Sequence, residues 1–184
     1  SVEEKLKDLE KENKDSLDEI RKLNEDSLEE AKRVLKKLED THRTVLRKLE
    51  KVLDELRKRG VPREDVERLK KIMEDAARKH KELLDDLRRK VKESEDRHRD
   101  HTRRVEEKSK ELRRELEDVR RRGEDDDAIR KLRKKVEDTS RDLKRTSDDL
   151  VRRNRKLLKE LEEESRKVVK ESDEILRKMK EEVR

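Results

Sequence analysis

The chain has 184 residues, of which 61% are charged and 26% apolar, and it contains no Phe, Trp, Tyr or Cys. The missing cysteine excludes disulfides and thiolate chemistry, and no apolar run approaches the about 18 residues that predict a membrane span. The net charge is +6, but acidic and basic residues alternate finely, so the sequence has neither the basic patch nor the stacking aromatics of a nucleic-acid binder.

The first helix is predicted over residues 2–58. It ends where a run of basic residues precedes Gly60 and then Pro62. Basic residues suit the negative end of the helix dipole, Gly suits the left-handed position after a helix, and Pro suits the first position of the next one. The second helix is therefore predicted over residues 62–121.

The third helix is predicted over residues 126–183. Three arginines precede Gly123, and acidic residues fill positions 124–127, which again matches one helix end and the next helix start. Turns this short make neighbouring helices antiparallel. We expect no targeting signal, and the sequence indicates no cellular compartment.

Each predicted helix carries an apolar stripe that repeats every eighteen residues, which is five turns at about 3.6 residues per turn. The repeats are Val2, Ile20, Leu38 and Leu56; Leu69, Leu87 and Val105; and Leu143, Leu161 and Met179. A stripe of this period runs along a helix without supercoiling. The sequence thus predicts an all-α fold: one domain, residues 1–184, forming an up-down-up three-helix bundle of long, nearly straight antiparallel helices.

Folding the chain at the two turns predicts a register. Residue i of the first helix should lie near residue 122 − i of the second and residue 128 + i of the third. Three apolar layers then form: Val52 with Leu69 and Met179, Leu35 with Leu87 and Leu161, and Leu9 with Leu112 and Val136.

Polar residues also lie on or near the inner stripe, and the register gathers them into three layers. The first holds Asn13, Ser16, Ser109, Thr139 and Ser140; the second holds Asn24, Ser27, Ser94, His98, His101, Thr102, Thr146, Ser147 and Asn154; the third holds Thr41, His42, His80, Ser165 and Ser172. Buried polar groups are costly unless hydrogen-bonded, so aligned layers predict buried hydrogen-bond networks that select register and topology. The alternative is that these residues sit at a hydrated edge of the stripe.

The four histidines admit three interpretations. They can be neutral members of the networks, or they can sense pH, since His42 and His80 should share a layer and repel when both are charged. Metal binding is the third interpretation, because Glu39-x-x-His42 and Glu95-x-x-His98 match the element of di-iron bundles. The register places those two elements about 27 Å apart, which argues against a shared metal site.

No signature of catalysis is present. Helical amides are already bonded, so they form no oxyanion hole, and the chain has no glycine-rich phosphate loop. We therefore expect no enzymatic activity, no cofactor and no small-molecule substrate.

The matched helices, the two minimal turns, the charged surface and the segmented Asn/Ser/Thr/His layers together resemble computationally designed helical bundles with buried hydrogen-bond networks. Natural three-helix rods such as spectrin-like repeats normally carry core aromatics. The resemblance implies a structural scaffold without natural biochemical activity.

Adjacent apolar pairs such as Val34/Leu35 widen the stripe, which favours the alternative of an interaction module that self-associates or accepts a partner helix, with a pH response through core histidines. Monomer and homo-oligomer are both open.

Overall fold

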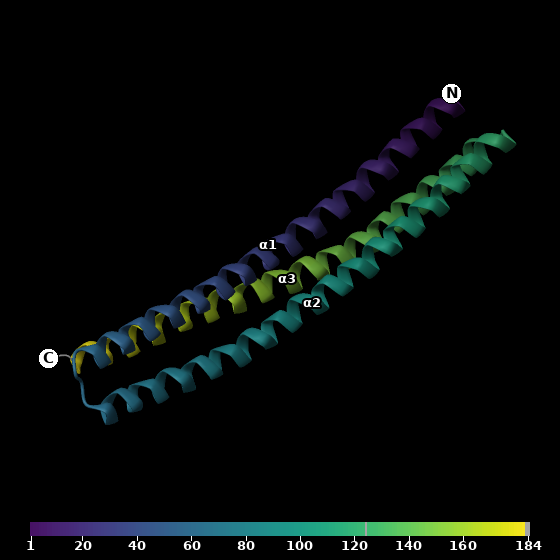
Figure 1. Cartoon of the computed structure of the whole chain (residues 1–184). Coiled ribbons are helices and arrows are strands. Elements are labelled where there is room, and N and C mark those ends of the chain that lie inside the picture. Colours follow the sequence, from purple (N-terminus) through teal and green to yellow (C-terminus); the bar gives the residue numbers. More distant parts are fainter. Residues whose placement is uncertain (124, 183–184) are drawn as a thin grey trace. The chain divides into compact units, whose positions relative to one another are not determined.

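The computed structural model describes residues 1–123 and 125–182 and contains three α-helices, α1 (Val2–Lys58), α2 (Arg63–Arg122) and α3 (Asp126–Glu181). Figure 1 shows α1 in purple to blue, α2 in teal and α3 in green to yellow. The described residues contain no strand. The predicted all-α three-helix bundle is confirmed. Five of the six predicted helix ends are right to within one residue, and the sixth, position 183, lies outside the described residues.

The turn after α1 is a Schellman motif centred on Gly60. The Gly60 amide donates to the Arg57 carbonyl at 3.1 Å, and the Val61 amide donates to the Leu56 carbonyl at 3.2 Å. Gly60 has a φ of 80°, a left-handed conformation that costs a residue with a Cβ about 1 kcal/mol or more. Val61 also packs against the core cluster that contains Leu56, the apolar contact that accompanies this motif.

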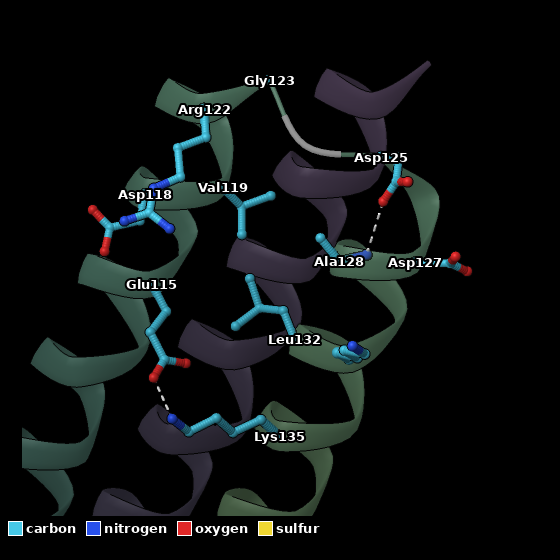
Figure 2. A pocket seen from close by; sticks show the side chains of 11 residues that line it. Glu115, Asp118, Val119, Arg122, Gly123, Asp125, Asp127, Ala128, Leu132 and Lys135 are labelled. Carbon is cyan, nitrogen blue, oxygen red and sulfur yellow. Dashed lines mark hydrogen bonds and ion pairs between the residues drawn. The ribbon is translucent and has the colours of Figure 1, made fainter.

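The turn between α2 and α3 uses the same chemistry and adds an N-cap. Gly123 has a φ of 62°, and its amide donates to the Arg120 carbonyl at 3.4 Å. Asp125 then caps α3, since its Oδ1 accepts from the Ala128 amide at 3.3 Å (Figure 2). At the other turn, Pro62 itself caps α2, and its carbonyl accepts from the Asp65 amide at 3.0 Å, so α2 begins one residue later than predicted.

The helices contribute to two compact units. Unit 1 contains residues 1–29 and 93–155, and unit 2 contains residues 30–92 and the chain from 156 onward. The core of unit 1 contains two apolar clusters, one around Leu9 and Leu112 and one around Ile20 and Val105. The core of unit 2 also contains two, one around Leu87 and Leu161 and one around Leu69 and Met179.

The predicted register places the apolar layers correctly. Leu9, Leu112 and Val136 share a cluster in unit 1. In unit 2, Leu35 packs against the cluster of Leu87 and Leu161, and Val52 packs against that of Leu69 and Met179. Three residues from three helices meet in every case because the apolar stripes have matched spacing.

Candidate functional site

The side-chain amide of Asn154, in unit 1, is 3% exposed and has hydrogen-bond partners on two other helices. Its Nδ2 donates to Ser27 Oγ of α1 at 2.9 Å and to His98 Nε2 of α2 at 2.7 Å. Its Oδ1 accepts from the Ser94 hydroxyl of α2. One α3 side chain is thus bonded to both other helices, and the bond to His98 requires a lone pair on Nε2, because an amide nitrogen only donates.

Two further bonds extend this group on α1 and α3. Ser147 Oγ donates to Asn24 Oδ1 at 2.6 Å, and Ser27 Oγ donates to the Asn24 carbonyl at 3.1 Å. We call the set the Asn154 cluster; it consists of Asn24, Ser27, Ser94, His98, Ser147 and Asn154. Its members lie three, four or seven residues apart on their helices, spacings that return a side chain to the same face.

The other predicted members of this layer behave differently. His101 is buried, yet neither ring nitrogen has a hydrogen-bond partner. Burial, and then the positive charge of Arg104, lowers the pKa of His101. Thr102 is half-buried and forms no hydrogen bond with a described residue. The prediction that Thr146 is buried is wrong: this side chain is exposed and donates to the Asp142 carbonyl of its own helix at 3.4 Å.

In the first predicted layer, which is also in unit 1, only some of the polar side chains form hydrogen bonds. Half-buried Ser16 and Ser140 hydrogen-bond to each other across α1 and α3. Buried Ser109 accepts from Arg113 of its own helix at 3.2 Å. Asn13 is buried but has no hydrogen bond with any described residue, and half-buried Thr139 has none either. Asn13 and Ser109 line a cavity of about 320 Å³ between α1 and α2.

The third predicted layer lies in unit 2 and holds a cluster of histidine and glutamate side chains. Buried His80 of α2 contacts Glu164 Oε1 through Nδ1 at 3.0 Å and Glu171 Oε2 through Nε2 at 2.7 Å. As predicted, His42 of α1 shares this layer, with ring centroids 6.4 Å apart. We call these four residues the His80 cluster. The remaining members, half-buried Thr41 and Ser165 and buried Ser172, form no hydrogen bond with described residues.

Sequence reasoning missed Glu164 and Glu171 because glutamate is the common surface residue of this chain. Glu164 is only 6% exposed. A signal was present, since Glu164 lies three residues after Leu161 and four before Val168, which places it on the apolar stripe. A carboxylate on such a stripe predicts a buried partner.

A pocket of about 730 Å³ lies in unit 1 where α2 ends and α3 begins (Figure 2). Its apolar wall is formed by Val119, Ala128 and Leu132, and its rim is charged. Lys135 and Glu115 pair across it. No His, Ser, Thr or Cys is among the described residues that line it, so they supply no hydroxyl or thiol nucleophile and no imidazole base.

Across the described part of the chain, no group of three or more His, Asp or Glu side chains has an arrangement that holds a metal ion. Within the same residues, no helix combines the length and the low charge that a membrane crossing requires. Comparison with family models, curated proteins and solved structures found no match to this chain.

Proposed function

We propose that this chain is a structural scaffold of the designed kind, without biochemical activity of its own, whose topology is specified by hydrogen bonds between buried polar side chains. The observation that carries the proposal is Asn154, whose amide is bonded to Ser27 of α1 and to Ser94 and His98 of α2. Each of these contacts is specific to one register of three helices.

A shift of α3 by one heptad shows why. It brings either Leu161 or Ser147 to the place of Asn154. Leucine has no donor or acceptor, and a serine hydroxyl has one donor, so partners on α1 and α2 are stranded either way. Each stranded buried group costs about 1–3 kcal/mol. Apolar layers alone discriminate less, because leucine packs against leucine in either register.

The test compares the protein with a variant in which all six residues of the Asn154 cluster are replaced by apolar ones. Spin labels at exposed Lys22 and Arg145, on α1 and α3 of unit 1, report their distance; the chain has no cysteine to interfere. We expect one narrow distance distribution for the protein and several distances for the variant, at equal or higher stability. A variant of Leu157→Ile controls for core substitution. One narrow distribution in all three proteins contradicts the proposal.

A second function, self-association or capture of a partner helix, is favoured by apolar side chains that the bundle leaves exposed. Leu23, Leu83 and Val169 are 43%, 38% and 44% exposed. Light scattering separates the two functions: the 22.5 kDa mass of one chain supports the self-contained scaffold, and a multiple supports self-association. If a multiple is found, glutamate at these three positions should return the mass to that of one chain.

A further inference from the structure

Both ring nitrogens of His80 face carboxylate oxygens, Nδ1 facing Glu164 at 3.0 Å and Nε2 facing Glu171 at 2.7 Å. A neutral imidazole has one N–H and one lone pair, and an ionised carboxylate has only lone pairs. A neutral ring between two carboxylates therefore leaves one contact with no proton. Two hydrogen bonds at these distances require one proton more.

That proton resides on the ring. The ordinary pKa of imidazole is about 6.5 and that of a glutamate carboxyl is about 4.3, so of the two bases the imidazole binds a proton more tightly. We propose that His80 is an imidazolium that bridges Glu164 and Glu171, and that this cluster is a proton-dependent clasp between α2 and α3 of unit 2.

His42 of α1 limits the clasp to one added proton. Its ring meets that of His80 edge to face at 67°, and its Nε2 is buried without a partner. Burial, then the charge of His80, lowers the pKa of His42, and Arg88 of α2 acts in the same direction. A hydrogen bond to the Ala77 backbone and the charge of Glu164 oppose them, but the net direction is downward. His42 thus stays neutral beside a charged His80.

The side chains of His80 and Glu164 are 7% exposed, whereas that of Glu171 is 36% exposed. The cavity next to the two rings is only about 20 Å³, space for about one water, and apart from His42, His80, Glu171 and Ser172 its lining is apolar. Loss of the proton leaves one of the two carboxylates facing a lone pair. Acid adds a second positive charge at His42, beside the imidazolium. The α2–α3 contact in unit 2 is therefore strongest between these limits, with a response on both sides.

The experiment records the two ring ¹⁵N signals of His80 by NMR at about pH 7, where an exposed imidazole is mostly neutral. His80→Gln assigns the signals. We expect both nitrogens to carry protons, the imidazolium pattern. A neutral pattern, with one protonated and one bare nitrogen, overturns the proposal.

Two matched variants test the cause. Glu164→Gln keeps the shape and removes the buried charge, so the His80 signals should change to the neutral pattern. Glu160→Gln removes a carboxylate of the same helix that pairs instead with Lys90 at 2.9 Å, and it should leave the imidazolium pattern unchanged. Helix content by circular dichroism shows that both variants fold. An imidazolium pattern retained in Glu164→Gln, or the same change in both variants, contradicts the clasp.

Discussion

Unit 1 and unit 2 both bury polar side chains between their helices, but with different chemistry. In unit 1, Asn154 joins three helices through neutral amide, hydroxyl and imidazole groups. In unit 2, His80 joins α2 to α3 through two carboxylates. The amide and hydroxyl groups of unit 1 keep their roles while the solution pH changes, and His98 accepts only while its Nε2 is unprotonated, whereas the His80 cluster needs one added proton. The comparison teaches that equally buried histidines can depend on opposite protonation states.

The largest effect should come from breaking the ionic cluster. His80→Leu leaves the buried Glu164 carboxylate without its nearest partner, and removing one member of a buried ion pair costs about 3–5 kcal/mol. Denaturant unfolding at about pH 7, above the carboxyl range, measures the loss. The double variant of His80→Leu and Glu164→Leu should recover most of it, because two apolar residues replace the pair. A double variant as unstable as His80→Leu shows that packing, not charge, is responsible.

The next effect separates bonded from unbonded amides in unit 1. Asn154 and Asn13 are similarly buried, at 3% and 4% exposed, but only Asn154 has partners among the described residues. Asn154→Leu should lower the free energy of unfolding by about 2–3 kcal/mol, since it strands several groups. Asn13→Leu should leave stability unchanged or raise it. Equal losses in the two variants contradict a role for the hydrogen bonds.

A smaller effect concerns acid. Burial lowers the pKa of His101 in the folded protein, so between that value and the unfolded value, about 6.5, the unfolded state binds more protons. The contribution of His101 to stability is therefore full above about pH 6.5 and declines as pH falls, until the folded ring is protonated. Denaturant melts between about pH 7.5 and 5 span this window. His101→Leu should show a shallower decline than the unaltered protein; parallel declines rule out this origin.

The smallest effect compares neighbours on α3. Ser147 is 1% exposed and donates to Asn24, whereas Thr146 is exposed and bonds only its own helix. Ser147→Ala should cost about 1 kcal/mol, the net value of one such bond. Thr146→Ala should change the free energy of unfolding by less than about 0.5 kcal/mol. Equal losses of stability in the two variants contradict a stabilising role for the hydrogen bond between Ser147 and Asn24.

The helices and their register were predictable from the sequence because their signals are local and periodic. Gly60 and Gly123 mark helix ends, and apolar residues at three- and four-residue steps place each layer. A residue one step from the stripe is rotated by about 100°, which is why Ser147 is buried and Thr146 is not.

The hydrogen-bond partners were less predictable. A register that is right to within about one helical turn, about 5.4 Å, does not determine contacts of about 3 Å. The sequence therefore grouped His42 with His80, but it did not reveal that Glu164 and Glu171 contact the two ring nitrogens of His80. Rotamers, rather than periodicity, decide which of several nearby polar groups meet.

The boundary between the two units falls inside unbroken helices, in α1 after residue 29, in α2 after residue 92 and in α3 after residue 155. The i→i−4 bonds of each helix continue through the boundary. Unfolding of one segment of a helix should therefore destabilise the adjacent segments, as it does between neighbouring repeats of a repeat protein, and should not stop at the boundary of a unit. Loosening the His80 cluster should raise amide exchange most in unit 2, and then progressively less along each helix into unit 1.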